Sequence, residues 1–572
     1  MEVINAIEGL MLDRLNYDFV KSVWEEEFTK FTALPDDYLE HINNYGINIL
    51  NEIIEAVDEW QTEVGDISED TEQKTWKELS ELNLNHEALL TVLWYFIENG
   101  LKNNNIGSKY ASLKAATLYF KLLSISGSRV YHAFHPYLCL KTLSVLKYVH
   151  LIAHKNKKFK KKIPQLSSDT PGREFFDTHL DGKESISLIK ELIKTLDALK
   201  IFVNKFTLQS DHELLEGIIE GLVETTRLEV NTSNFMTYNI NNSNVDRVLS
   251  SLTYNAYETL KLLCVPQHGM IEDTVIIIMK HLLTSLLLSD HELTFREQCI
   301  VREHTVHFVK YLISILGEVA FKGATLLLHN IFTKIGERAE VRQKGKESIV
   351  DIMQTLPNKQ YTDLVKWLFD CAHCDKASYR VLALEIIAQL LYEVPLRPHN
   401  KNVTRNIRDI DSESASNDTE IEDSNDTIPC SNPPSAVNDI LLHKYMLAVI
   451  FARFRDSSAN VRTKALTVLV QCMKSDNMVV TSLMNEIFVL NQQSESSEKG
   501  ILSYKQLKAL LSKINDVNPL PSAGIILSEL QSMTCDSKVY VRKAAMQALE
   551  NIMKLNRSWL TGNILKVSYY HF

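Results

Sequence analysis

Glycine and proline are scarce in this chain, with 18 glycines and 13 prolines among 572 residues. Globular proteins usually contain about 7% glycine and about 5% proline. The shortage excludes collagen-like chains and disordered chains rich in these residues. It also argues against a β-sandwich or barrel, which needs a turn about every 8–12 residues.

Cysteine is also sparse, and the apolar runs of the chain are short. The eight cysteines show no framework spacing, which is typical of buried thiols in a reducing compartment. The first five residues have neither the basic nor the apolar region of a signal peptide, so we expect none. The longest apolar stretch, residues 274–288, is interrupted by Lys280 and His281 and is shorter than the roughly 20 residues of a bilayer span. We interpret it as a buried helix and expect no contact with a membrane.

The overall charge does not favour nucleic acid. The chain has 61 basic and 72 acidic residues, a net charge of −11, so any contact with DNA must come from a local patch. Apolar residues make up 45% and charged residues 23%, which allows a large buried core.

Helical periodicity dominates the sequence. Apolar residues recur at helical spacing in four segments, 47–57, 89–97, 214–223 and 309–316, and no series of alternating strands is evident. Short polar turns such as Gln209-Ser210-Asp211 join one helical segment to the next. We therefore predict an all-α protein.

Two segments interrupt this pattern and define the expected organisation. Residues 155–181 begin with lysines and become rich in Ser, Asp and Pro, and residues 395–438 hold eight acids between Asp409 and Asp426 with few large apolar side chains. The second segment cannot bury enough surface to offset its ordering entropy, so we expect a disordered acidic insertion. The expected parts are an N-terminal helical region (1–154), a basic and polar loop (155–181), helical repeats (182–394), the insertion (395–438), further repeats (439–556) and an atypical end (557–572).

An internal repeat is visible around four arginines, with the period of about 40 residues that is typical of paired-helix arrays. Arg342, Arg380, Arg462 and Arg542 are each followed three positions later by Gly or Ala, and seven positions later by Ile or Leu. Arg342 and Arg380 are one period apart. Arg380 and Arg462 are also one period apart once the insertion is removed, and Arg462 and Arg542 are two periods apart. An aspartate precedes three of the arginines, namely Asp375, Asp456 and Asp536.

This pattern predicts how the repeats pack. An aspartate in the turn between two helices can cap the second helix. The arginine in the first turn of that helix can reach the aspartate of a neighbouring unit and tie successive units together. The small residue lets the next helix approach closely. Because no unit closes its own core, neighbouring units must bury each other.

The repeated pattern resembles the HEAT repeat, in which an aspartate is followed by Val-Arg and then by Ala-Leu on the second helix of a helical pair. Residues 338–342, 444–466 and 535–545 are similar, more specifically, to the D-type, non-SMC HEAT subunits of condensin II. The specific likeness covers about residues 326–394 and 441–555, and residues 1–320 match only in helical character and order. Members of that family are much longer, and here the helical pattern stops near Asn556, so we expect a chain truncated at its C-terminus, as a fragment or a short isoform.

The resemblance implies a fold and a function. The fold would be an α-solenoid of stacked HEAT-type helical hairpins. The protein would be a non-catalytic scaffold and regulatory subunit that binds kleisin and the SMC ATPase subunits of condensin II and engages chromatin, without sequence preference, in mitotic chromosome condensation. It would act in the nucleus, on chromosomes, and its partners would hydrolyse the ATP. The alternative is another HEAT scaffold, such as a nuclear import receptor or a phosphatase scaffold.

Motifs for catalysis are absent from the sequence. It contains no Gly-x-x-x-x-Gly-Lys phosphate loop and no Gly-x-Ser-x-Gly elbow. Cys371 and Cys374 form a lone Cys-x-x-Cys, whereas a structural zinc site needs a second pair, so we interpret this segment as part of a buried helix. We expect no enzyme activity, cofactor, metal or small-molecule substrate.

A lysine cluster is the strongest local electrostatic feature. It consists of Lys155, Lys157, Lys158, Lys160, Lys161 and Lys162. Three interpretations stay open: a solvated loop, a nuclear import signal, and a salt-dependent DNA contact that does not read bases. Thr170, followed by Pro171, has the form of a cyclin-dependent kinase site, and a phosphate there would weaken the neighbouring positive charge.

Overall fold

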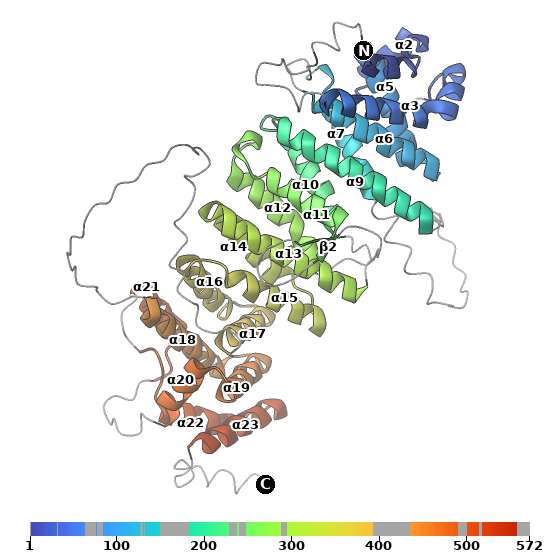
Figure 1. Ribbon diagram of the computed structural model, residues 1–572. Helices are drawn as coiled ribbons and strands as arrows, with labels where there is room; N and C mark the ends of the chain where they lie inside the picture. Colours follow the sequence, from blue (N-terminus) through green and yellow to red (C-terminus); the bar gives the residue numbers. More distant parts are fainter. Residues whose placement is uncertain are drawn as a thin grey trace, which may run out of the picture. The chain divides into compact units, whose positions relative to one another are not determined.

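In the computed structural model, the described part of the chain is almost entirely helical (Figure 1). The structure describes residues 2–30, 33–62, 76, 84–103, 105–125, 130, 132–148, 182–227, 237–239, 248–287, 294–392, 435–489, 500–513 and 518–556. The chain divides into two compact units, Met1–Gly345 and Lys346–Phe572. Each unit is described by itself.

The first unit consists of consecutive helices with one short strand pair. Its helices are α1 (Glu2–Glu8), α2 (Tyr17–Glu25), α3 (Asp36–Thr62), α5 (His86–Lys102), α6 (Ile106–Leu123), α7 (Pro136–Leu143), α9 (Gly182–Lys205), α10 (His212–Thr226), α11 (Ser251–Leu262), α12 (Ile271–Leu286), α13 (Phe295–Leu316) and α14 (Glu318–Lys334). Three short 3-10 helices accompany them, η1 (Leu12–Arg14), η3 (Ser144–Tyr148) and η5 (Pro266–His268). The helix α15 (Ala339–Met353) contains the boundary between the units.

The strand pair is a minor departure from the all-helical pattern. β1 (Thr237–Asn239) and β2 (Val248–Ser250) pair antiparallel, with Thr237 opposite Ser250. With only three residues in each strand, the pair is far too short to form a layer of the fold.

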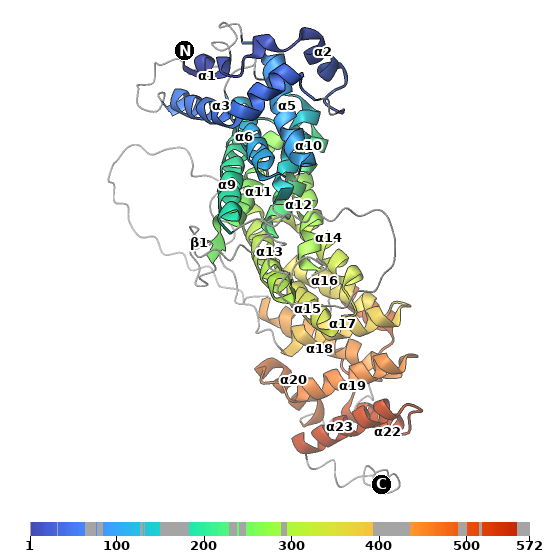
Figure 2. The ribbon, with the colours of Figure 1, turned by 90° about the vertical axis from the view of Figure 1, so that its right-hand side faces the viewer.

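The helices of the first unit pack in two layers (Figure 2). One layer contains α3, α6, α9 and α11, each packed on the next, and the other contains α5, α7, α10, α12 and α14. Consecutive helices such as α5 and α6, or α10 and α11, form hairpins that connect the layers. Each hairpin therefore buries its apolar faces against its neighbours, as in a repeat array.

In the helix α5, more residues are buried than the apolar spacing of the sequence predicts. The apolar spacing in residues 89–97 predicts one buried face, but every residue from Ala88 to Ile97 is buried. The reason is that α5 contacts α2, α6 and α7 at once. The indole N–H of Trp94 finds a partner inside this core, the carbonyl oxygen of Phe28 at 3.2 Å.

Polar residues begin several helices as the sequence predicts. The Asp211 carboxylate accepts a hydrogen bond from the Leu214 N–H at 2.9 Å and caps α10. Thr294 and Glu297 form a reciprocal capping box at the start of α13. These caps satisfy backbone N–H groups that have no partner within the helix.

The second unit continues the same architecture. Its helices are α16 (Asn358–Cys371), α17 (Ala377–Tyr392), α18 (Ser435–Ala452), α19 (Ala459–Met473), α20 (Met478–Phe488), α21 (Tyr504–Lys513), α22 (Ala523–Met533) and α23 (Val539–Leu555), with the 3-10 helix η6 (Arg453–Arg455) between α18 and α19. The helices α17, α19 and α23 stack on one another, and α16 packs on both α17 and α18. The predicted all-α solenoid of stacked HEAT-type hairpins is confirmed.

Parts of the expected organisation fall outside the described residues. These are residues 155–181, residues 395–434 of the expected insertion and residues 557–572. The first turn of α18, which begins at Ser435, overlaps the last residues of the range expected for the insertion. In the described part of the chain, no helix combines the length and apolar character that crossing a bilayer requires.

Candidate functional site

The four repeat arginines occupy equivalent places in their helices. Arg342, Arg380, Arg462 and Arg542 each stand at the fourth residue of a helix, in α15, α17, α19 and α23. Three positions later stand Ala383, Ala465 and Ala545 in the second unit, all buried. The matching residue of the first unit is Gly345, where a Cβ atom would collide with the Ile335 side chain. The repeat in the sequence is thus a repeat in the structure.

Each of the last three arginines folds back on its own turn. One guanidinium nitrogen, Nη1, donates to two carbonyl oxygens that precede the helix. The acceptors are Cys374 and Asp375 for Arg380 (2.8 and 2.7 Å), Asp456 and Ser457 for Arg462 (2.7 and 3.2 Å), and Asp536 and Ser537 for Arg542 (2.8 and 3.4 Å). The arginine therefore fixes the conformation of the turn that leads into its helix.

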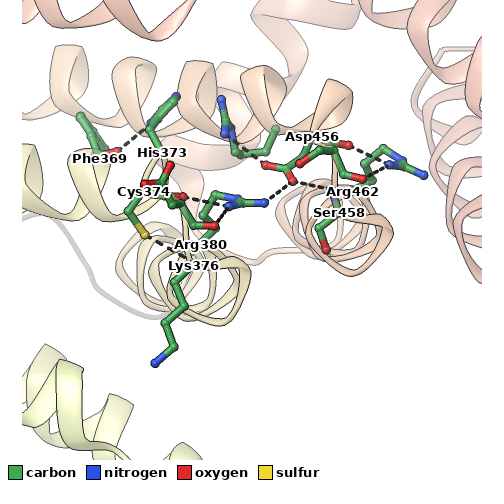
Figure 3. Close-up of polar contacts among 11 residues, drawn as sticks. Phe369, His373, Cys374, Lys376, Arg380, Asp456, Ser458 and Arg462 are labelled. Atoms are coloured by element: carbon green, nitrogen blue, oxygen red, sulfur yellow. Dashed lines mark hydrogen bonds and ion pairs between the residues drawn. The ribbon is translucent and has the colours of Figure 1, made fainter.

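The other nitrogen, Nη2, reaches the next repeat. Arg380 Nη2 lies 2.8 Å from Asp456 Oδ1, and Arg462 Nη2 lies 2.8 Å from Asp536 Oδ2. The partners of each pair are far apart in the chain. Figure 3 shows Arg380 and Arg462 on either side of Asp456. We call this series the Arg–Asp ladder, and it connects α17 to the start of α19 and α19 to the start of α23.

The carboxylates of the ladder also fix the turns that precede their own helices. Asp456 Oδ1 accepts a hydrogen bond from the Ser458 N–H at 2.8 Å, and Asp536 Oδ1 accepts one from the Lys538 N–H at 2.8 Å. Asp456 has a further cationic partner, since Arg453 Nη1 lies 3.1 Å from its Oδ2. Each aspartate thus joins a hydrogen bond within its own turn to an ion pair with the preceding repeat.

The first ion pair of the ladder is shielded from water. The side chains of Arg380 and Asp456 are 8% and 3% exposed. Burial lowers the pKa of Arg453, and the adjacent Asp456 carboxylate counteracts that effect. Charges at this depth are stable only with full pairing, because removing one partner leaves the other desolvated and unpaired.

Asp375 and Arg342 were also predicted to take part in stacking the repeats. Asp375 contributes its backbone carbonyl to Arg380, while its residue is exposed. Arg342 lies in the first unit, whereas Asp375 lies in the second. The lysine cluster 155–162 and Thr170 lie outside the described residues.

A second set of inter-helix ion pairs was missed by sequence reasoning. Glu385 of α17 lies 3.4 Å from Lys346 Nζ of α15 and 2.8 Å from Lys464 Nζ of α19. These residues follow the repeat arginines by different numbers of positions, so no periodic signal identifies them. Isolated charges in the middle of a helix suggest a solvated face, and only the stacking shows that Glu385 bridges two neighbours.

The prediction that the Cys-x-x-Cys segment is part of a buried helix is wrong. Cys371 is the last residue of α16, and His373 and Cys374 lie in the following turn, not inside a buried helix. Burial raises the pKa of the Cys371 thiol to about 12, which opposes formation of the thiolate. Within the described ranges, no three His, Cys, Asp or Glu side chains are grouped to hold a metal ion.

Comparisons with known proteins agree with this architecture. The sequence profile of the family described as condensin-2 complex subunit D3-like, N-terminal domain, matches residues 19–185. The profile of HEAT repeats associated with sister chromatid cohesion matches residues 438–469, which include Asp456 and Arg462 of the ladder.

Two relatives match nearly the whole chain. Condensin-2 complex subunit D3-L of Xenopus laevis is 24% identical over 96% of this chain, and condensin-2 complex subunit D3 of Mus musculus is 23% identical over 94%. The chain is thus similar to condensin-2 D3 subunits over nearly its whole length.

The D3-like chain is shorter than these relatives. It spans 38% of the length of the Xenopus protein and 36% of the mouse protein. Similar solved structures include Kap121p bound to RanGTP (TM-score 0.28, 10% identity, 97% of this chain and 43% of that one). Another is the C-terminal fragment of the Chaetomium thermophilum cohesin loader SCC2 (TM-score 0.28, 9% identity, 99% and 45%).

Proposed function

We propose that this D3-like chain is a non-catalytic scaffold and regulatory subunit of a condensin II complex. The observation that carries the proposal is the match to two condensin-2 D3 subunits along nearly the whole chain. The stacked hairpins support it, because repeat arrays present long surfaces that suit the binding of other proteins.

The partners follow from the same family. The relatives are subunits of a condensin-2 complex, so a D3-like chain should bind other condensin subunits. We assign it the kleisin and the SMC ATPases as protein partners and chromatin as its target in mitotic chromosome condensation. It would work in the nucleus, and ATP hydrolysis would belong to the ATPase subunits.

The Arg–Asp ladder has a structural role in this proposal. Each ion pair of the ladder joins a guanidinium to a carboxylate that also accepts a backbone N–H in the turn before a helix. The geometry of each pair is fixed, because the planar guanidinium donates to its own turn through Nη1 and to the next repeat through Nη2. The ladder would therefore hold α17, α19 and α23 in register and preserve the surface that partners bind.

The lysine cluster and Thr170 complete the proposal as regulatory elements. Six lysines within residues 155–162 would bind phosphates without reading bases, or would serve nuclear import. A phosphate on Thr170 would add about −1.5 to −2 charges nearby and weaken either interaction.

The test is reconstitution with the other subunits from the same species. The tagged chain is co-expressed with the kleisin and the SMC ATPases, purified, and analysed by crosslinking mass spectrometry. We expect stoichiometric recovery and crosslinks from the helical units to the kleisin. Failure to recover the kleisin, with capture of a Ran-type GTPase from the same cells, would instead favour an import receptor.

A further inference from the structure

A cavity of about 190 Å3 lies among α16, α18 and α21 in the second unit. Its walls are mostly apolar and are formed by Phe369, Val449, Leu507 and Leu511. An apolar cavity of about 150 Å3 is enough to admit a benzene molecule. The cavity is partly open to solvent, so it offers room for one large apolar side chain from outside.

The helix α21 is held over the cavity by a polar bridge to α16. The Tyr504 hydroxyl donates to the Asp370 carboxylate, and Lys508 Nζ lies 3.1 Å from the same Oδ1 atom. The Tyr504 ring stacks on the His373 ring with centroids 4.3 Å apart. The bridge sets the spacing between the helices, and the apolar side chains leave the cavity between them.

The charges around the cavity favour an anionic group. Lys366 and Lys508 both line it, against the single carboxylate of Asp370, which already accepts from Tyr504 and Lys508. Lys366 Nζ lies 3.5 Å from Asp363, but that carboxylate is 61% exposed and such pairs are weak. Lys366 therefore remains able to pair with an incoming carboxylate.

The remaining polar group of the lining is neutral. His373 Nδ1 lies 2.7 Å from the Phe369 carbonyl oxygen, to which it can only donate. Burial lowers the pKa of this ring to about 4, assisted by Arg453 and opposed by Asp370, Asp456 and the hydrogen bond to Phe369. The imidazole is thus uncharged near neutral pH, and the two ammonium groups determine the sign of the rim.

We propose that this cavity binds a short segment of a partner protein in which a large aromatic or aliphatic side chain stands next to a carboxylate. The apolar side chain would enter between Phe369, Val449 and Leu511, and the carboxylate would pair with Lys366. Deep apolar anchors of this kind supply most of the affinity at protein interfaces, while charges at the rim select the partner. The proposal concerns the second unit alone and does not depend on assembly into condensin.

The experiment uses the full chain and two matched small probes. The first is 3-(indol-3-yl)propanoate, an aromatic ring with a carboxylate, and the second is tryptamine, the same ring with an ammonium group. Binding is measured by saturation-transfer NMR titration. We expect the propanoate to bind at least about fivefold more tightly than tryptamine, the ratio for one partly exposed charge pair.

Variants test the two halves of the site separately. Lys366→Glu should reverse the preference between the probes, whereas Lys543→Glu, the same change at an exposed position of α23, should leave it unchanged. Leu511→Trp places an indole at the cavity and should abolish binding of both probes, with thermal unfolding recorded to verify that the fold is intact. Equal binding of the two probes, or no effect of Lys366→Glu, would refute carboxylate recognition. Unchanged binding in a folded Leu511→Trp chain would refute the cavity as the site.

Discussion

At the scale of single residues, Asp456 is the position on which most interactions converge. It accepts from Arg380 of the preceding repeat, from Arg453 of its own repeat and from the Ser458 backbone N–H. Because Arg380 is buried as well, the carboxylate is needed to compensate a charge that has little access to water.

We predict that Asp456→Ala destabilises the second unit by about 3–5 kcal/mol, the range for leaving a buried charge unpaired. The matched control is Arg455→Ala, one residue earlier, whose guanidinium pairs with Glu529 but is 64% exposed. That change should cost about 1 kcal/mol or less. Urea-induced unfolding followed by circular dichroism compares the two, and equal effects would argue against the ladder as a stabilising element.

His373 provides a prediction about pH. Its folded-state pKa, about 4, lies below the usual 6.5, so the unfolded chain binds the proton more readily. The stabilising contribution of the neutral ring is complete above pH 6.5 and is lost progressively as the pH falls towards 4. We expect the melting temperature of His373→Gln to decline less between pH 7 and pH 5 than that of the wild-type chain. Parallel declines would show that other groups control acid stability.

At the scale of elements, each helix depends on its first turn and on its neighbours. The Asp211 cap on α10 satisfies an N–H group that the helix leaves open, and the aspartates before α19 and α23 hold the turns that lead into those helices. The capping residue is short-range chemistry and can be identified in the sequence. The opposing helix cannot, as α5 shows, where every residue from Ala88 to Ile97 is buried.

The cap of α10 is testable separately from the ladder. Asp211→Ala should cost about 1 kcal/mol and increase hydrogen exchange in the first turn of α10, at Leu214 in particular. Ser210→Ala, at the adjacent exposed position, is the control and should leave exchange there unchanged. Local exchange measured by mass spectrometry on peptides covering this turn separates the two results.

At the scale of the whole molecule, the repeat array limits how far a perturbation spreads. Each hairpin contacts its neighbours, so stability is close to a sum over repeats and their interfaces. In Asp456→Ala, we expect faster hydrogen exchange in α17, α19 and α23 and unchanged exchange in α3, α5 and α6. Uniform loss of protection along the chain would indicate a single cooperative core instead.

The lysine cluster is also tested on the whole chain. Changing all six lysines of residues 155–162 to Ser should reduce DNA retention, with a weaker dependence on salt, or reduce nuclear accumulation. We expect an unchanged melting temperature, because the predicted role of these lysines is to supply charge and not to pack in the core. If retention and localisation are both unaltered, the cluster is a solvated loop.

Local pattern in the sequence was enough to predict the helices and the repeat around the four arginines. Of the arginines and aspartates that it singled out, Arg380, Arg462, Asp456 and Asp536 form the ladder, whereas Asp375 contributes only its backbone carbonyl. The predicted features depend on the spacing of residues within one or two helical turns. The prediction that Arg380 and Arg462 reach the aspartate of a neighbouring unit depended on the repeat itself, and the structure places both pairs at 2.8 Å. The count of periods was wrong for the second pair, because two periods separate Arg462 from Arg542 in the sequence whereas α19 packs directly on α23.

Tertiary structure alone decided the contacts that have no period. Glu385 bridges two helices, residues 88–97 of α5 are buried on every face, and the cavity beside α21 is lined by residues from Lys366 to Leu511. The physical reason is that periodicity identifies which face of a helix is apolar, while the identity of the facing helix, and any space left between them, depends on how all the side chains pack together.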